Sequence, residues 1–306
     1  MAGCSEFRPW AYLLPELLGL IFCKLSLQEI LTVVPAVCKT WNDIVLGPYC
    51  WVDIDILEWS IMCKPEQLDR MVQMLLTRSS GACSRLTVSG LHTESIFNFI
   101  ADNSESLKKL ELPRSEITDA IVEQLVPRFS NLTSLDLSEC HKITARALEA
   151  FGTNCKSLVE LRRRMHPVDM GEIVFQDDQL YAIANTMPKL RRLQINYLPL
   201  TANSVLEILS RCKDLEYLDL RGCWDVKLNK KWIKEKYPNL KVVGPDILDF
   251  LDNSWEDCSD DSDSSGYSWM DEEDGVSDDE QVLDDFQIHF FGPDLDVFAS
   301  LTIGFP

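Results

Sequence analysis

The chain has 306 residues, of which 46% are hydrophobic, and its formal net charge is -20. This length and composition fit a globular protein with two domains, or one domain with appended segments. The charge is uneven: 19 of the 49 acidic residues follow Lys241 and no Lys or Arg does, which leaves 30 acidic against 29 basic residues in residues 1–241. This nearly neutral body lacks the basic stripe of a nucleic-acid-binding protein.

Neither membrane insertion nor secretion is indicated. No apolar segment approaches the roughly 20 residues that span a bilayer, because Pro15, Glu16 and Lys24 bound the longest one. The N-terminus contains Glu6 and Arg8 and lacks the basic start and apolar stretch of a secretory signal. We therefore expect a protein of the nucleus and/or the cytoplasm.

The cysteines also favour an intracellular protein. There are eleven, none in a C-x-x-C pair, and four scattered His residues cannot complete a zinc site with them. Free cysteine packs as a small hydrophobe, and disulfides are rare inside cells. We expect no metal and no cofactor, and reduced, structural thiols at the positions whose pattern looks buried. These are Cys23, Cys38, Cys83, Cys140, Cys155, Cys212 and Cys223.

Residues 10–51, after an extension of residues 1–9, predict three short helices. The first begins at Pro15, which suits the first turn of a helix. Ser26 and Glu29 have the spacing of a capping box and start a second helix through Val34. The third is expected from about Ala36 to Leu46. The stripe of the first helix contains Leu17, Leu18, Ile21, Phe22 and Leu25. Such small helices bury little apolar surface, so the module needs a partner.

Residues 52–82 predict a connector that contains one amphipathic helix, beginning at Pro65. The apolar residues on one of its faces are Leu68, Met71, Val72, Leu75 and Leu76. We interpret this helix as a cap that covers the first coil of the repeats that follow.

Residues 83–245 repeat one phrase seven times: an apolar residue, two variable ones, an apolar residue, one variable, an apolar residue. Its first positions are Cys83, Leu107, Leu132, Leu158, Leu190, Leu215 and Leu240, at spacings of 24, 25, 26, 32, 25 and 25 residues. A period of 20–29 residues with this phrase is typical of leucine-rich repeats. The predicted fold is therefore α/β, a short solenoid with parallel strands on its concave face and helices outside.

The concave face offers candidate binding residues, because strand side chains alternate and those flanking the last two apolar positions point away from the core. Arg and Tyr dominate many interfaces, and both recur in the fourth to sixth repeats. The candidates are Glu160, Arg162, Arg164, Arg192, Asn196, Tyr217, Asp219 and Arg221. The alternative is a solvated face on which Glu160 and Asp219 neutralise the arginines.

Two further features of the repeats carry expectations. In the fourth repeat Arg163 replaces the last leucine, and a surplus of six to eight residues lies in residues 165–175. This insertion is either a loop that reaches the partner or a tolerated surface addition. Thr118, Thr144 and Thr201 are expected to N-cap the return helices.

Residues 246–306 form an acidic segment for which we expect disorder, because its composition buries little apolar surface. It is interpreted as a solubilising tail, as a substrate of acid-directed kinases at Ser254, Ser268 and Ser277, or as a segment that folds back on the arginines. The apolar residues 286–291 have no predicted place.

Two of these features together resemble a known family. Leu14-Pro15, Val37-Cys38-Lys39-Thr40-Trp41 and Trp51 look like an F-box, and the repeats have the form C-K-x-L-x-x-L-x-L at Cys212 and, with Arg163 in place of the last leucine, at Cys155. Over residues 10–245 the chain is similar to plant F-box proteins with leucine-rich repeats, above all the FBW group. The resemblance implies a non-catalytic substrate receptor of an SCF-type cullin–RING ubiquitin ligase. In that family the F-box binds a Skp-type adaptor, and through it cullin and RING subunits, while the repeats bind a protein substrate for ubiquitination and degradation.

Carried over by position, the resemblance implies an adaptor-binding set: Leu14, Pro15, Leu18, Ile21, Leu25, Leu31, Val37 and Trp41. The alternative is a self-contained helical cap with these residues in its core. Two other functions stay open, a repeat scaffold without a ligase role and a small-molecule-dependent F-box receptor. An enzyme is not indicated, because the sequence contains no nucleophile–base set and no phosphate-cradling loop.

Overall fold

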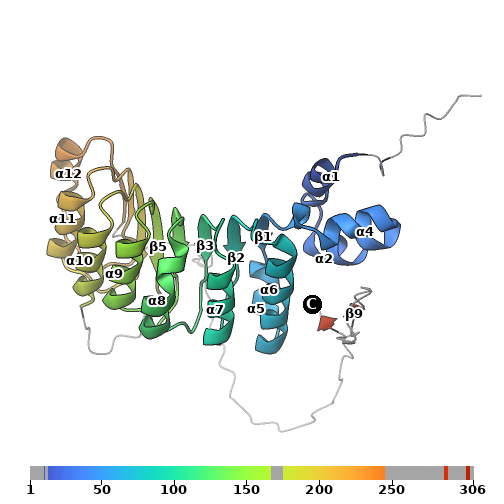
Figure 1. The fold of residues 1–306 in the computed structure, drawn as a ribbon. Coiled ribbons are helices and arrows are strands. Elements are labelled where there is room, and N and C mark those ends of the chain that lie inside the picture. Colours follow the sequence, from blue (N-terminus) through green and yellow to red (C-terminus); the bar gives the residue numbers. More distant parts are fainter. Residues whose placement is uncertain (1–9, 11–12, 167–174, 245–285, 289–300, 304–306) are drawn as a thin grey trace, which may run out of the picture. The chain divides into compact units, whose positions relative to one another are not determined.

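The computed structural model describes residues 10, 13–166, 175–244, 286–288 and 301–303, and divides the chain into two units, Met1–Ile247 and Leu248–Pro306. The first unit contains a helical module followed by stacked strand–helix repeats (Figure 1). The predicted order of helices and then α/β repeats is therefore confirmed. Among the described residues no helix has both the length and the apolar character needed to cross a membrane.

The helical module contains four α-helices and one short 3-10 helix among its described residues: α1 (Pro15–Phe22), α2 (Leu27–Thr32), α3 (Val34–Val37), α4 (Lys39–Leu46) and η2 (Pro48–Cys50). The predicted capping box is present, because Ser26 Oγ accepts from the Glu29 amide and Glu29 Oε2 accepts from the Ser26 amide. The predicted third helix is instead two helices, since Cys38 is extended with φ -164° and ψ 165°. The second helix ends early because Pro35, the second residue of α3, has no N–H with which to continue α2.

The module has its own small core. Leu18 and Phe22 of α1 are 0% and 2% exposed, and the Trp41 ring lies 4.9 Å from the Phe22 ring. Trp51 is buried and its Nε1 donates to the carbonyl of Val45 at 2.7 Å. These contacts fix one face of α1 against α4 and η2.

The repeats build one parallel sheet. Its eight strands, counted over the described residues, are β1 (Asp53–Asp55), β2 (Arg85–Thr87), β3 (Lys109–Glu111), β4 (Ser134–Asp136), β5 (Glu160–Arg164), β6 (Arg192–Asn196), β7 (Tyr217–Asp219) and β8 (Lys241–Val243). Each strand pairs in parallel with the next, so that the central leucines, from Leu86 to Leu218, stand in register in the core. A strand is present at each of the seven predicted repeats. β1 was not predicted, because Asp53-Ile-Asp55 lacks the leucine phrase.

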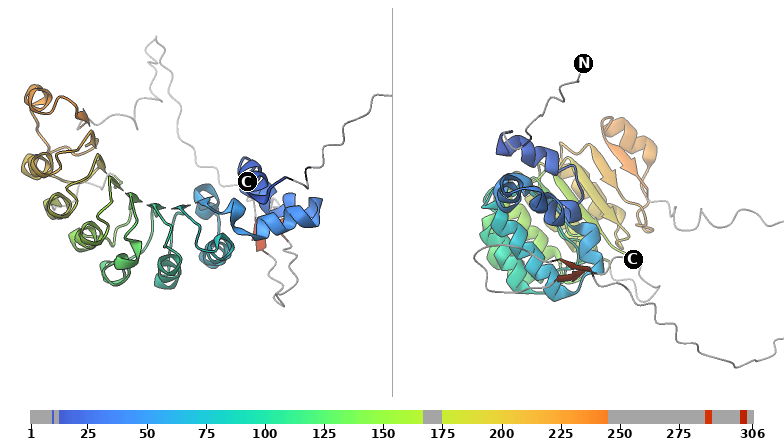
Figure 2. Two further views of the ribbon diagram at one scale, coloured as in Figure 1. Left: turned by 45° about the horizontal axis from the view of Figure 1, so that its top comes forward. Right: turned by 90° about the vertical axis from the view of Figure 1, so that its right-hand side faces the viewer.

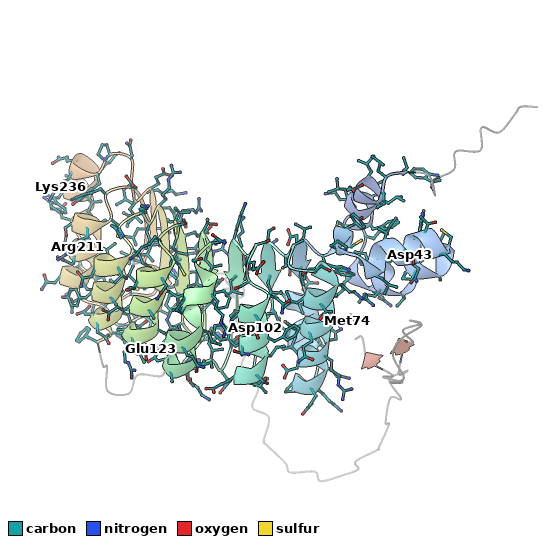
Figure 3. All side chains as sticks on the ribbon, viewed as in Figure 1. Asp43, Met74, Asp102, Glu123, Arg211 and Lys236 are labelled. Carbon is teal, nitrogen blue, oxygen red and sulfur yellow. The ribbon has the colours of Figure 1, made fainter. Side chains whose placement is uncertain are left out.

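The strands line the inner side of the curve, and helices cover the outer side of the sheet (Figure 2). The helices are α5 (Leu57–Met62), α6 (Pro65–Ser79), α7 (Glu94–Asp102), α8 (Asp119–Leu125) with η3 (Val126–Phe129), α9 (Ala145–Asn154), α10 (Asp177–Thr186), α11 (Ala202–Arg211) and α12 (Lys230–Lys236). The predicted apolar face of α6 is buried. The outer surface is polar, with charged side chains such as Asp102, Glu123 and Arg211 (Figure 3).

The predicted helix caps are confirmed at two of three threonines. Thr118 Oγ1 accepts from the Ile121 amide at 3.5 Å, and Thr144 Oγ1 accepts from the Arg146 amide at 3.3 Å. Thr201 makes no such cap, and its hydroxyl donates to Asp177 Oδ2 at 2.8 Å. Sequence spacing identified the helix starts but not the carboxylate partner of Thr201.

Five of the seven cysteines predicted to be buried are buried: Cys83, Cys140, Cys155, Cys212 and Cys223. Several of these thiols donate to carbonyls of the preceding coil, as Cys140 Sγ does to Leu112 O at 3.1 Å. Two predictions were wrong, since Cys23 is exposed and Cys38 half-buried. Both lie at helix ends, where only one side of the residue meets the core. Every cysteine that the structure describes is a free thiol.

In the second unit, β9 (Phe286–Ile288) pairs antiparallel with β10 (Leu301–Ile303), which accounts for part of the apolar segment 286–291. The other expectations for residues 246–306, and those for most of the insertion in the fourth repeat, lie outside the described residues.

Candidate interaction surfaces

The helical module exposes a set of large apolar side chains, which we call the module surface. Its members are Leu14 (64%), Leu17 (47%), Leu20 (64%), Ile21 (43%), Leu25 (40%), Val33 (57%) and Val37 (56%). On α1 and its flanks, Leu14, Leu17, Ile21 and Leu25 follow one another at helical spacing and therefore lie along one side. Soluble proteins rarely leave a contiguous apolar patch uncovered unless it binds a partner. The module surface is therefore a candidate docking site.

The structure separates the predicted adaptor set into exposed and buried residues. Leu14, Ile21, Leu25 and Val37 belong to the module surface, while Pro15 and Trp41 are half-buried. The prediction was wrong for Leu18 (0% exposed) and Leu31 (7%), which pack in the core of the module and have no free face to offer.

Sequence reasoning missed Leu17, Leu20 and Val33 as surface residues. The apolar stripe of α1 is wide enough to serve two surfaces. Leu18 and Phe22, four residues apart, face the core, whereas Leu17 and Ile21, also four apart, face outward. The spacing identifies both rows but cannot say which one the rest of the chain covers.

The candidate residues of the sheet fall into columns across the strands. One column contains Glu160, Arg192, Tyr217 and Lys241, and the next contains Arg162, Gln194 and Asp219. Arg164 pairs with Asn196, and the Tyr197 amide donates to the carbonyl of Arg221. The parallel register thus brings the predicted arginines of three successive coils onto one face.

Carboxylates on the same face bind several of these arginines, as the alternative interpretation had it. Glu160 Oε1 lies 3.1 Å from Arg162 Nη2 and 3.8 Å from Arg192 Nε, so that one carboxylate serves two guanidinium groups. Arg162 also lies 3.8 Å from Asp136. Burial lowers the pKa of Arg162, but Glu160 and Asp136 more than offset it, and the net shift is upward. These carboxylates therefore neutralise only part of the positive charge of the arginines on this face.

Two predicted binding residues have a different role. Asp219 is 0% exposed and Asn196 3%, so neither can contact a partner. Asp219 accepts from Arg221 Nη2 at 2.8 Å and from Asn196 Nδ2 at 2.8 Å. Burial works to raise the pKa of Asp219, but the hydrogen bonds from Arg221 and Asn196 outweigh it and lower the pKa. The ionised Asp219 therefore positions the half-exposed Arg221.

Tyr217 lies between two cations. The Arg192 guanidinium is 5.0 Å from the ring centroid and Lys241 Nζ is 5.8 Å from it, within the range of cation–π attraction. Lys241 was missed as a candidate because it belongs to the last repeat, although it occupies the same column. Arg164 is exposed, and no ion pair to its side chain is present among the residues that the structure describes.

The opposite end of the face has the opposite charge. Arg85 is surrounded by Asp53 at 3.6 Å, Asp55 at 3.3 Å and Glu111 at 3.7 Å. Burial raises the pKa of Asp136, the next acidic residue on β4. The strand face is therefore acidic over β1–β4 and basic over β5–β8.

Arg163 is a structural residue. It is 2% exposed, and its guanidinium donates to the carbonyls of Leu137 (3.0 Å), Cys140 (2.9 Å) and Ile143 (2.8 Å) and to Gln179 Oε1 (3.2 Å). Burial lowers its pKa. The arginine that replaces the leucine thus joins the fourth coil to the third and to α10.

Among the described residues, no cluster of His, Cys, Asp or Glu side chains could hold a metal ion.

Comparison with known proteins finds a matching family for the helical module and another for the repeats. The F-box-like family matches residues 12–57, and the Leucine Rich repeat family matches residues 130–152. F-box protein FBW2 of Arabidopsis thaliana is 53% identical over 277 residues, which cover 89% of this chain and 87% of that protein. F-box protein SKIP19 of the same plant is 32% identical over 78% of each chain. Putative F-box/LRR-repeat protein 23 is 33% identical over 73% of this chain and 50% of its own length.

Proposed function

The chain belongs to the family of plant F-box proteins with leucine-rich repeats, and from this premise we propose that it is the substrate-recognition subunit of an SCF-type cullin–RING ubiquitin ligase. The observation that carries the proposal is the module surface, which lies on the helices of the F-box match. An F-box binds a Skp-type adaptor, and an uncovered row of Leu, Ile and Val side chains is what such an interface requires.

The energetics support docking. Burying a Leu, Ile or Val side chain contributes about 1.5–3 kcal/mol. Several such residues together can offset the cost of association, estimated at about 4–15 kcal/mol. In the proposed complex α1 and its N-cap supply Leu14, Leu17 and Ile21, while Val33 lies between α2 and α3 and Val37 ends α3.

The join between the module and the repeats suits a receptor. The amides of Ser84 and Arg85 donate to the carbonyl of Val52, at 2.8 and 3.3 Å. The Arg78 guanidinium of α6 lies 5.9 Å from the centroid of the buried Trp51 ring. Because these contacts attach the module directly to the first coils, a substrate on the repeats would be held at a defined distance from the adaptor. Proximity of this kind raises the effective concentration of substrate lysines near a ubiquitin carrier.

Catalysis in this proposal belongs to other subunits. Cullin and RING subunits join through the adaptor, and the repeats capture a protein substrate for ubiquitination and degradation. A repeat scaffold without a ligase role would keep the repeats but have no use for an exposed apolar row on the F-box.

The test is co-purification of the full chain with a Skp-type adaptor and a cullin. The disrupting variant is Leu14→Ala, Ile21→Ala, Val37→Ala, which shortens three exposed side chains. The matched control is Ile61→Ala, Met62→Ala, Leu206→Ala, which shortens three exposed apolar side chains outside the module (53%, 63% and 36% exposed).

We expect capture by the wild-type chain and by the control, and loss of capture by the disrupting variant with unchanged thermal unfolding. Failure of the folded wild-type chain to capture the adaptor would overturn the proposal. Equal loss of adaptor capture in both variants would show that capture depends on exposed apolar side chains in general. That result would contradict docking through the module surface.

A further inference from the structure

The sheet face of β5–β8 has a surplus of positive charge, which we call the basic half. It contains Arg162, Arg164, Arg192, Arg221 and Lys241, with Tyr217 among them. The carboxylates on this part of the face are Glu160 and Asp219. Five cations against two anions leave three positive charges in a body whose net charge is close to zero. The surplus is therefore local, and it lies on the face that no helix covers.

Two of the cations, Arg192 and Lys241, form a row across the strands. Neighbouring strands lie about 4.8 Å apart, so Arg192 and Lys241, two strands apart with Tyr217 between them, have their backbones about 10 Å apart. The two guanidinium groups that do meet, those of Arg162 and Arg192, already share Glu160. A single phosphate group would therefore find no pair of free guanidinium groups here that could bind it together. Separate single charges along an extended chain match the row better.

We propose that the basic half binds an extended, Asp- and Glu-rich segment of the protein substrate. This inference rests on the proposed function, because it names the class of substrate that the repeats take. An extended chain presents alternate side chains to one side about 6.8 Å apart. Carboxylates on a chain that crosses the strands would meet Arg192 and Lys241, whose long side chains can span the difference between about 6.8 Å and about 10 Å, while the Tyr217 ring offers an apolar surface to the chain between them.

The acidic half of the face supports the choice of partner. Asp53, Asp55 and Glu111 outnumber Arg85 and its register partner Lys109, so an acidic segment is repelled from β1–β3. Repulsion at one end and attraction at the other fix where on the face such a segment binds. Because Arg192 (53%) and Arg162 (36%) have exposed side chains, the attraction is screened by salt.

The test measures fluorescence anisotropy of a labelled peptide that alternates Glu and Ser, titrated with the full chain. The disrupting variant is Arg192→Glu, Lys241→Glu. The matched control is Lys231→Glu, Lys234→Glu, which changes net charge equally at exposed positions of α12 on the helical side. A second probe replaces each Glu by Gln and carries one phosphoserine. Titrations are run at about 0.05 M and about 0.3 M NaCl, between which the Debye length falls from above 10 Å to below 8 Å.

We expect the Glu peptide to bind more weakly at the higher salt concentration, about tenfold or more weaker to the disrupting variant, and within about threefold of wild type to the control. Equal weakening in both variants would overturn the proposal, because net charge would then explain the binding. Binding of the phosphoserine probe without the Glu peptide would also overturn it in favour of a phosphate site. Adaptor capture by the same variants is measured in parallel. Its loss would count against the ligase role, whereas lost peptide binding with intact capture counts against the basic half alone.

Discussion

The hydroxyl of Thr144 donates to Asp119 Oδ2 at 2.5 Å, and the backbone amide of Thr144 donates to Asp119 Oδ1 at 2.9 Å. Asp119 begins the helix of the preceding coil. The same arrangement links Thr201 to Asp177, with both distances 2.8 Å. Hydroxyl–carboxylate bonds of the same kind join Thr118 to Glu94 at 3.1 Å and Thr93 to Asp69 at 3.0 Å. These bonds form a threonine–carboxylate ladder that joins the N-terminal parts of α6, α7, α8 and α9 in turn, and those of α10 and α11.

The first prediction concerns this ladder. Asp119→Ala leaves the amide and hydroxyl of Thr144 without their partner, and we expect it to lower the free energy of unfolding by about 1–2 kcal/mol. The measurement is urea denaturation followed by circular dichroism. Glu123→Ala is the control, because Glu123 lies one turn later on α8 and pairs with the exposed Arg146. An exposed pair is worth about 0–1 kcal/mol. Equal destabilisation by the two variants would contradict a role for the ladder.

The second prediction concerns Arg163. Arg163→Leu restores the leucine of the repeat phrase, yet we expect it to destabilise the chain. It removes hydrogen bonds from a charged donor to the carbonyls of Leu137, Cys140 and Ile143, each worth about 1.5–3 kcal/mol. Relief of the buried charge offsets part of this loss. The expected net effect is a loss of about 3 kcal/mol in urea denaturation.

Arg146→Leu is the matched control for this substitution. The Arg146 side chain is 70% exposed, and its loss removes one surface ion pair. We expect a change of less than about 0.5 kcal/mol. If Arg163→Leu were as stable as the wild-type chain or more so, the interpretation of Arg163 as a fastener between coils would be wrong.

Periodicity predicted the repeats because each central leucine meets its equivalents in the neighbouring coils, as Leu135 meets Leu110 and Leu161. A contact between equivalent residues of neighbouring coils appears in the sequence as a regular spacing. The hydroxyl of Thr201 is different. Its partner Asp177 lies 24 positions earlier, and local spacing does not identify that contact.

Candidate surface residues were predictable by position but not by exposure. Alternation along a strand places Asp219 and Arg221 on the same face, yet the ion pair between them buries Asp219 and leaves Arg221 half-exposed. Likewise, helical spacing places Leu17 and Leu18 in one apolar stripe, although η2 and α4 cover only one side of it. Which residues remain uncovered depends on elements that are distant in sequence.

The third prediction separates docking from folding on α1. Leu17 is 47% exposed and Leu18 is 0% exposed. We expect Leu17→Ala to weaken adaptor capture with little change in the thermal midpoint, because its half-exposed side chain lies outside the module core. Leu18→Ala creates a cavity in the module core and should cost about 2–5 kcal/mol of stability. Differential scanning calorimetry and adaptor capture are measured on both variants. Reduced stability of Leu17→Ala with unchanged capture would contradict this assignment.

The fourth prediction concerns Cys23, which follows α1 beside the module surface. Its thiol is exposed, whereas Cys50 is 2% exposed. A hydrogen bond with the Cys50 thiol, opposed by partial burial, lowers the pKa of Cys23 to about 7. The pKa of Cys50 is raised by the same interaction. Because the thiolate is the reactive form, Cys23 should be alkylated faster than an ordinary thiol at neutral pH.

Iodoacetamide labelling at a series of pH values, with each cysteine resolved by peptide mass spectrometry, measures this difference. The rate at Cys23 should rise from pH 6 and level off above about pH 8, one unit past its pKa, where the thiolate predominates. Cys50→Ala removes the hydrogen bond and should move the midpoint up toward the ordinary value of 9.0. Cys63 is an internal control, because burial raises its pKa to about 11 and its rate should still be rising at pH 9. A Cys23 midpoint that stays the same in Cys50→Ala would exclude the Cys50 thiol as the cause. If the adaptor covers the module surface, bound adaptor should slow labelling of Cys23 while leaving the rate at Cys63 unchanged.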